Sequence, residues 1–233
     1  MEVPHMNIYT FVTSNPNKTP DSFPLVTDAL TKCSITYGEW KRDTRRWAAG
    51  LQSLGFKHGD VLALFSFNQV DYSITMFGPM LLGGATTTAN SAYTVDELAY
   101  QLTDSGASVL VAHPEMITTA LESAKKAGIP LSNVFVYGEQ TVQDCRPYSS
   151  LFPDISTPES QLPQAVMLHG TEAAETTALI CYSSGTTGRS KGVELSHVNL
   201  CVNALQVTAA DGPIPPCENV ELSVLPMYHA YVF

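Results

Sequence analysis

The sequence predicts an α/β fold with mainly parallel sheet layers flanked by helices. Three observations lead to this class. Short continuous apolar runs recur along the chain, as is typical of strands buried on both faces. Segments with apolar residues three and four positions apart, a helical pattern, alternate with these runs. Glycine, proline and capping residues separate the two kinds of segment, and this alternation is typical of parallel sheets with crossover helices.

Residues 1–33 are polar, contain several prolines and show no clear period, so we predict no element there. A short strand at 34–37 opens the alternation, followed by a helix at 38–54 and a buried strand at 61–65. The pattern then repeats. Its members are a helix at 70–82, a strand at 85–89, a helix at 94–102 with a capping box of Thr94 and Glu97, a strand at 108–112, a helix at 114–127 and a strand at 134–137.

The second half of the chain is less regular. Residues 141–177, here called the irregular connection, are interrupted by four prolines and predict a long surface segment. We expect residues 1–140 to form a first α/β subdomain and residues 178–233 to begin a second one, all within one incomplete domain. The second part should contain a strand at 178–182, a loop of small residues, a returning strand, a helix capped by Ser196 and a last strand at 220–225. We expect these strands to form a second layer.

The amino-acid composition limits the classes of function that the chain can have. Hydrophobic residues make up 44% of the 233 residues and charged residues 15%, so the chain can bury a sizeable core. The net charge of −10 argues against nucleic acid as a partner. We interpret the densest basic group, Lys41, Arg42, Arg45 and Arg46, as a solvated helix face.

Cysteines and histidines give no metal or disulfide pattern. The five cysteines, Cys33, Cys145, Cys181, Cys201 and Cys217, are scattered and contain no C-x-x-C, which indicates a reducing compartment without structural zinc. The histidines form no close pair, so we do not expect a metal held by protein side chains alone. No secretory signal is visible, and we interpret the charge-free stretch between Asp71 and Asp96 as a buried helix and strand rather than a membrane span. An intracellular location is expected.

The most informative stretch follows the predicted strand at 178–182. It consists of Ser183, Ser184, Gly185, Thr186, Thr187 and Gly188, with Lys191 three residues later. Hydroxyls, exposed amides and a cation around a tight turn suit an oxyanion, above all a phosphate chain. An ordinary hairpin turn is the alternative. Six turn-type residues are more than a short hairpin needs, and the spacing around the lysine differs from G-x-x-x-x-G-K-[ST].

The segment from Tyr182 to Val193 resembles the signature loop of the adenylate-forming superfamily, which includes acyl-CoA synthetases, 4-coumarate–CoA ligases, beetle luciferases and peptide-synthetase adenylation domains. Ser190 stands where this family usually has proline. Stretches at 35–37, 48–51, 57–61, 89–98 and 104–107 also match the family's N-terminal pattern. The resemblance implies the incomplete N-terminal domain of the adenylate-forming fold, nearest the 4-coumarate–CoA ligase-like branch.

A second signature lies near the end of the chain, at residues 225–231. On spacing alone, His229 is better interpreted as a structural histidine. In the family, the corresponding histidine lies where the acyl carboxylate meets the α-phosphate, and the tyrosine matched by Tyr231 lines the acyl pocket. Val232 stands where glycine is frequent.

The resemblance implies a two-step reaction. A small carboxylic acid attacks the α-phosphate of ATP with Mg²⁺, giving an acyl-adenylate and pyrophosphate, and CoA then displaces AMP. Ser183 to Gly188 and Lys191 would hold the β- and γ-phosphates, and His229 would position the carboxylate. A carrier-protein thiol in place of CoA, and a non-catalytic nucleotide-binding remnant, are the alternatives.

Several family parts have no counterpart in the 233 residues. These are the adenine and ribose contacts and the C-terminal domain with its catalytic lysine. We therefore expect a fragment or a truncated product that is inactive alone, with Val224, Leu225 and Phe233 exposed toward a missing C-terminal portion or a partner chain. The location would be cytoplasmic or peroxisomal, with any peroxisomal signal lost.

Overall fold

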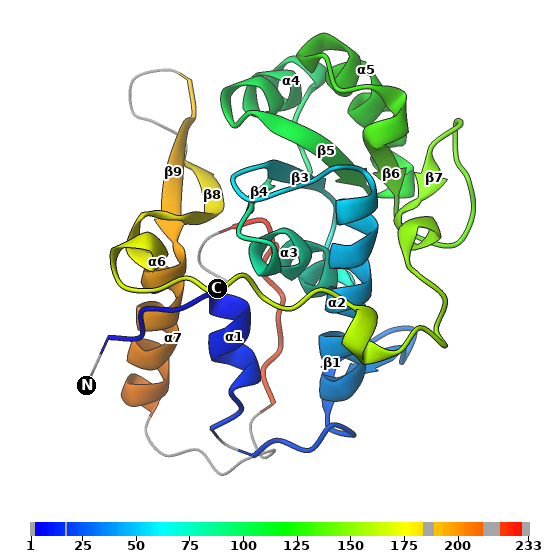
Figure 1. The fold of residues 1–233 in the computed structure, drawn as a ribbon. Coiled ribbons are helices and arrows are strands. Elements are labelled where there is room, and N and C mark those ends of the chain that lie inside the picture. The colour runs from blue at the N-terminus through cyan, green and yellow to red at the C-terminus, as the bar shows by residue number, and fades with distance from the viewer. Residues whose placement is uncertain (1–2, 17, 184–188, 212–219, 230–233) are drawn as a thin grey trace.

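The computed structural model describes residues 3–16, 18–183, 189–211 and 220–229. Their strands form a two-stranded sheet, β1-β2, and a seven-stranded sheet in the order β7-β6-β5-β3-β4-β8-β9 (Figure 1). The strands are β1 (Pro24–Thr27), β2 (Ser34–Thr36), β3 (Val61–Phe65), β4 (Ala85–Thr88), β5 (Ala107–Ala112), β6 (Val134–Val136), β7 (Arg146–Pro147), β8 (Thr177–Ser183) and β9 (Lys191–Ser196). The large sheet is parallel from β7 to β8, and only its edge pair β8-β9 is antiparallel.

Helices cover both faces of the large sheet. They are α1 (Ile8–Thr13), α2 (Tyr37–Ser53), α3 (Tyr72–Leu81), α4 (Val95–Asp104), α5 (Ile117–Ala127), α6 (Thr171–Glu175) and α7 (His197–Asp211). Strand β3 shows the two faces, because Leu62 and Leu64 belong to the core shared with α2 and α3, whereas Val61, Ala63 and Phe65 belong to the core shared with α4 and α5. Every residue of β3 is buried, so its continuous apolar run follows from burial on both sides.

Local signals place the helix ends as expected. Thr94 with Glu97 forms the expected capping box at the start of α4, and Thr36 with Glu39 forms a second one, not predicted from the sequence, at the start of α2. Helix α5 ends at Gly128, whose φ of 78° lies in the left-handed region that glycine adopts without strain. The predicted fold class, a mainly parallel α/β sheet flanked by helices, is confirmed.

The prediction of no element in residues 1–33 is wrong, because α1 and β1 both lie there. Helix α1 has only six residues, too few to show a period. Tertiary contacts hold it in place: Asn7 Nδ2 donates to Met80 O (2.8 Å), and the backbone N–H of Ile8 donates to His197 Nδ1 (3.0 Å). In Figure 1, α1 lies beside α7, far away in the sequence.

The expectation of a second layer is also wrong. Strand β8 pairs in parallel with β4, so β8 and β9 extend the same sheet as β3, β4 and β5. The threonines of β4 explain part of this pairing, since the buried Thr87 hydroxyl donates to Ile180 O at 3.0 Å. The expectation that residues 183–191 connect two strands is confirmed. The subdomain boundaries near residues 140 and 178 stay a prediction.

Residues 220–225 are not a strand, contrary to the sequence pattern. Their apolar side chains are exposed, at 90% for Val220, 77% for Leu222 and 73% for Val224. None of the described strands pairs with this segment. An apolar pattern predicts a strand only where a neighbouring strand can supply hydrogen bonds.

The basic group on α2 is not a solvated face. Arg45 donates from Nε to Pro163 O at 3.1 Å and from Nη2 to Leu162 O at 3.0 Å, and Arg46 donates from Nη2 to Pro153 O at 2.7 Å. The two side chains are only 12% and 15% exposed. They hold the irregular connection against α2.

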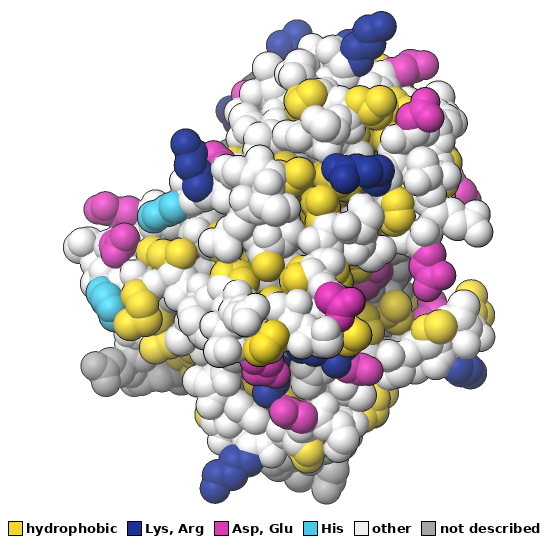
Figure 2. Space-filling model, turned by 45° about the vertical axis from the view of Figure 1, so that its right-hand side comes forward, with side chains coloured by type: hydrophobic (Ala, Val, Ile, Leu, Met, Phe, Trp, Pro, Cys, Tyr) yellow, Lys and Arg dark blue, Asp and Glu magenta, His cyan; other side chains and the backbone are white. Residues whose placement is uncertain are grey.

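Among the described residues, no helix has both the length and the apolar character needed to cross a membrane. In the same part of the chain, no three His, Cys, Asp or Glu side chains come together as a metal site would require. The face in Figure 2 mixes Lys and Arg with Asp and Glu instead of gathering one sign into a patch.

Candidate functional site

The predicted phosphate loop starts at the carboxyl edge of the parallel sheet. Strand β8 ends at Ser183, β9 begins at Lys191, and these two residues face each other as the last pair of the antiparallel ladder. Both are exposed. Ligands of open α/β sheets bind at this edge, beyond the carboxyl ends of the strands. The predicted contacts of Ser184, Gly185, Thr186, Thr187 and Gly188 lie outside the described residues and stay a prediction.

A cavity of about 610 Å³ opens at the same edge. It brings Ser183 and Ser190, on the two sides of the loop, to one hollow together with His229. Its other lining residues are Thr88, Asn90, Tyr93, Glu97, Cys181, Tyr182, Val193, Leu195 and Tyr228. Two signatures separated by more than thirty residues in the sequence therefore line one site. Tyr231, predicted to line an acyl pocket, lies outside the described residues.

Two side chains hold the segment that carries His229. Asn68, just after β3, donates from Nδ2 to Leu225 O (2.8 Å) and accepts from Met227 N at Oδ1 (2.7 Å). Thr88, at the end of β4, donates to Tyr228 O at 2.8 Å. The backbone turn closes with His229 N donating to Pro226 O at 3.0 Å. The histidine thus stands on a turn fixed to the ends of two neighbouring parallel strands.

Buried amide and hydroxyl groups fix the floor of the cavity. Gln101 of α4 donates from Nε2 to Thr87 Oγ1 (2.8 Å) and to Thr88 O (3.2 Å). Thr87 in turn donates to Ile180 O of β8. Asn68, Thr88 and Gln101 were not predicted from the sequence as part of the site. The polar run at 86–88 inside a predicted buried strand was the signal available for the threonines, because buried hydroxyls require partners.

Two nucleophilic side chains of the cavity wall, those of Cys181 and Tyr182, are protonated rather than ionised. Burial raises the pKa of the Cys181 thiol, and the thiolate is the reactive form. Burial, together with the hydrogen bond that its hydroxyl donates to Asp104, raises the pKa of Tyr182. At neutral pH both side chains stay protonated. The site is therefore built to bind and position a substrate through hydroxyls and amides.

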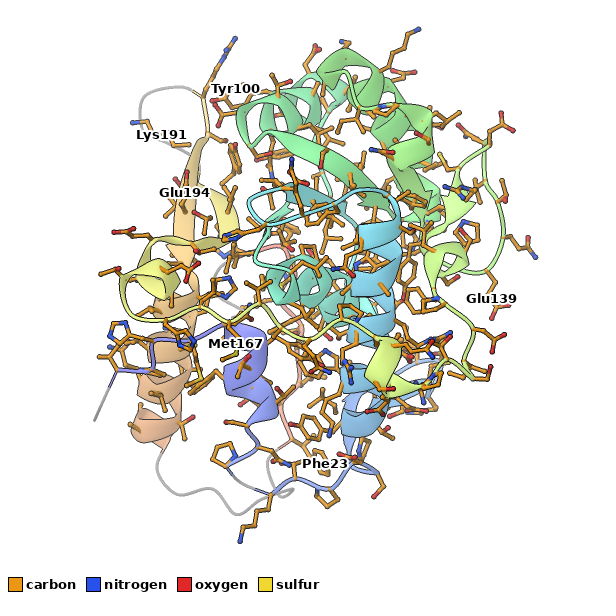
Figure 3. The ribbon with its side chains drawn as sticks, viewed as in Figure 1. Phe23, Tyr100, Glu139, Met167, Lys191 and Glu194 are labelled. Atoms are coloured by element: carbon orange, nitrogen blue, oxygen red, sulfur yellow. The ribbon has the colours of Figure 1, made fainter. Side chains whose placement is uncertain are left out.

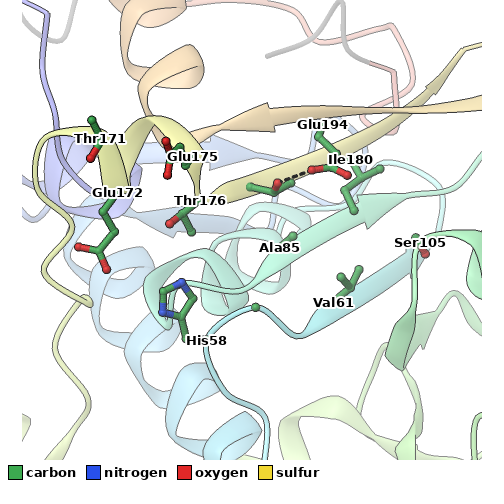
Figure 4. A pocket seen from close by; sticks show the side chains of 13 residues that line it. His58, Val61, Ala85, Ser105, Thr171, Glu172, Glu175, Thr176, Ile180 and Glu194 are labelled. Carbon is green, nitrogen blue, oxygen red and sulfur yellow. Dashed lines mark hydrogen bonds between the residues drawn. The ribbon is translucent and has the colours of Figure 1, made fainter.

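A second hollow, of about 520 Å³, lies at the amino-terminal ends of the parallel strands, near the starts of β3, β4 and β8 (Figure 4). His58, Glu172 and Glu175 line it, and Glu194 accepts a hydrogen bond from Thr177 Oγ1 at 2.7 Å. None of the described residues that the sequence predicts to bind or catalyse, Ser183, Lys191 and His229, lines it.

A mainly parallel sheet with helices on both faces and a polar cavity at the carboxyl ends of its strands is typical of α/β proteins that bind ligands. The chain belongs to the AMP-binding enzyme family, whose model matches residues 12–233. This confirms the resemblance to adenylate-forming enzymes.

Individual relatives agree with the family. 4-Coumarate–CoA ligase 3 from Arabidopsis thaliana is 33% identical over 229 residues, which cover 97% of this chain and 39% of that protein. Acyl-CoA ligase AFT1-1 from Alternaria alternata is 31% identical over 188 residues, covering 79% and 32%. The red-emitting luciferase of Phrixothrix hirtus has the same fold, with a TM-score of 0.81 at 22% identity over 99% of this chain and 55% of that chain. The chain thus spans about two fifths or less of the length of these two ligases.

Proposed function

We propose that this chain carries the phosphate-binding part of an acyl-CoA synthetase of the 4-coumarate–CoA ligase-like branch. The enzyme would activate a small carboxylic acid with ATP and pass the acyl group to CoA. The observation that carries the proposal is the shared cavity, which Ser183, Ser190 and His229 line together. The names of the relatives, which are CoA ligases, support the same reaction class.

The described residues suit a polyphosphate chain. Ser183 offers a hydroxyl, and Lys191, adjacent to the cavity-lining Ser190, offers an exposed ammonium group that forms no ion pair with a described residue. Together with Ser184, Gly185, Thr186, Thr187 and Gly188, they would hold the β- and γ-phosphates of ATP. Adenylation needs charge stabilisation on the phosphates more than covalent catalysis.

His229 would position the carboxylate of the acid, and Tyr231 would line the acyl pocket. Mg²⁺ takes substrate phosphates and water as most of its ligands. The only carboxylate that the described cavity wall offers it is Glu97, whose Oε2 already accepts from the Thr94 N–H and hydroxyl. The ion would therefore enter with the nucleotide.

ATP–pyrophosphate exchange with a panel of aromatic and fatty acids tests the reaction class, on the natural polypeptide that contains these residues. We expect exchange that depends on the acid and that Lys191→Ala reduces at least tenfold, as loss of a charged phosphate contact of about 1.4 kcal/mol or more implies. Lys57→Ala, an exposed lysine near the opposite edge of the sheet, is the matched control. Absence of exchange with every acid would exclude a ligase, and formation of acyl-CoA from free CoA separates CoA from a carrier-protein acceptor.

We further infer that residues 1–233 alone bind polyphosphate weakly and do not catalyse adenylation or acyl transfer to CoA. The relatives devote more than half of their length to segments outside this match. The test is AMP release from ATP by purified residues 1–233, with a panel of acids and CoA. Turnover above that of Lys191→Ala would contradict the inference.

The four free cysteines among the described residues, three of them buried, support a reducing environment, and we place the protein in the cytoplasm or the peroxisome. Imaging of the tagged natural protein would test this placement.

A further inference from the structure

Both sides of the phosphate loop are attached to one helix. Before the loop, Tyr182 of β8 donates its hydroxyl to Asp104 Oδ2 at 2.6 Å. After the loop, Ser190 accepts at its backbone carbonyl from the Tyr100 hydroxyl at 3.2 Å. Tyr100 and Asp104 are four residues apart on α4 and therefore lie on the same side of the helix.

Ring contacts join the same groups. The guanidinium of Arg189 lies 5.2 Å from the centre of the Tyr100 ring, within the range of a cation–π contact. The rings of Tyr100 and Tyr182 meet edge to face, with centres 6.5 Å apart and planes at 86°. Figure 3 shows Tyr100 on α4 near the loop end of β9, where Lys191 begins the strand. Tyr100 thus contacts residues on both sides of the loop.

Helix α4 is itself well fixed. Its capping box closes the N-terminal turn, and Leu98 and Leu102 are buried in the core. Gln101, next to Tyr100, hydrogen-bonds to Thr87 and Thr88 of β4. A helix held in this way can fix whatever is attached to its exposed side.

We propose that Tyr100 and Asp104 are positioning residues, which hold the two ends of the phosphate loop against α4 and so prepare the loop for a polyphosphate chain. The proposal rests on the proposed function of the loop. Ordering a binding loop before its ligand arrives reduces the entropy lost on binding and raises affinity. Both residues act through Tyr182, Arg189 and Ser190 and not by contact with the phosphates.

Binding of inorganic tripolyphosphate, measured by calorimetry on the 233-residue chain, tests the proposal. We expect Tyr100→Phe and Asp104→Ala each to weaken binding about fivefold, which corresponds to about 1 kcal/mol, the net contribution of one hydrogen bond. Asp104→Asn, which keeps an acceptor oxygen, should restore most of the affinity. Tyr100→Leu, which also removes the ring beneath Arg189, should weaken binding more than Tyr100→Phe.

The matched control is Tyr37→Phe. The Tyr37 hydroxyl donates to a backbone carbonyl, that of Val12, at the same 3.2 Å, on the α2 side of the sheet away from the loop. A merely structural effect would lower the melting temperature in Tyr100→Phe and Tyr37→Phe alike and leave tripolyphosphate affinity equal. Wild-type affinity in both Tyr100→Phe and Asp104→Ala would overturn the proposal.

Failure of the proposed function gives a different result. If the wild-type chain does not bind tripolyphosphate, the phosphate role is lost. Hydrogen exchange of the Lys191, Gly192 and Val193 amides then tests whether Tyr100 and Asp104 hold the ends of the loop. Faster exchange in Tyr100→Phe and Asp104→Ala than in Tyr37→Phe would support it. Equal exchange in all three variants would overturn it.

Discussion

Acid should destabilise this protein through one buried histidine, His197, at the start of α7. The side chain is fully buried, and its Nδ1 accepts the backbone N–H of Ile8 at 3.0 Å. Nδ1 therefore carries no proton in the folded chain. Among the described residues, Nε2 has no hydrogen-bond partner. Burial, and secondarily the charge of His58, lowers the pKa of His197 from its ordinary 6.5 to about 4.

The direction of the effect follows from proton binding. Between pH 6.5 and about 4 the imidazole is protonated in the unfolded chain but neutral in the folded chain. The unfolded chain then binds more protons, so the free energy of unfolding falls as the pH falls through this interval. The loss amounts to roughly 2 kcal/mol at pH 5 and approaches roughly 3 kcal/mol near pH 4. The full stabilisation is present above pH 6.5.

Urea unfolding of wild type and His197→Asn between pH 7.5 and 4.5 measures how much the titration of His197 contributes to the free energy of unfolding. Asparagine cannot titrate, and its side-chain oxygen can accept the Ile8 N–H where Nδ1 did. We expect the free energy of unfolding of wild type, relative to that of His197→Asn, to be roughly 2 kcal/mol higher at pH 7.5 than at pH 5. The advantage of wild type should therefore shrink as the pH falls. The exposed His169 supplies the control His169→Asn, which should leave the pH dependence of wild type unchanged. Parallel curves for wild type and His197→Asn would refute the reasoning.

Three further outcomes can be measured directly. Gly78→Ala should lower the free energy of unfolding by about 3 kcal/mol, the upper end of usual overpacking costs, because a Cβ there would lie 2.2 Å from Trp47 Cδ1; an unchanged melting temperature would contradict this close packing. Asn68→Ala removes the two hydrogen bonds that Asn68 makes to the segment 220–229 and leaves that of Thr88, so limited proteolysis should cut this segment faster while the melting temperature stays constant; equal cutting rates would show that the Asn68 bonds do not hold it. Arg45→Met should lose about 2 kcal/mol in urea unfolding, because carbonyls of the irregular connection lose their donors; wild-type stability would mean that water replaces the guanidinium without loss.

Some features of the site could be predicted from the sequence because their signals are local. The small residues from Ser183 to Gly188 with Lys191 mark a loop between two strands, and β8 and β9 confirm that placement. The same holds for the capping box of α4, where both partners lie within four residues. That His229 shares a cavity with this loop could not be predicted from spacing, because the turn that carries it is anchored by Asn68 and Thr88, far away in the chain.

The sequence by itself determined the fold class, the order of most strands and helices and the position of the connection between β8 and β9, which we propose binds phosphate, since apolar periods, caps and glycines act over a few residues. Only the tertiary structure decided that β8 joins β4 in one sheet, that the six residues of α1 are helical and that 220–225 is not a strand. It also attached Tyr182 and Ser190 to Asp104 and Tyr100, across 78 and 90 residues. The physical reason is common to these cases: each depends on hydrogen-bond partners distant in sequence, which a local pattern does not specify.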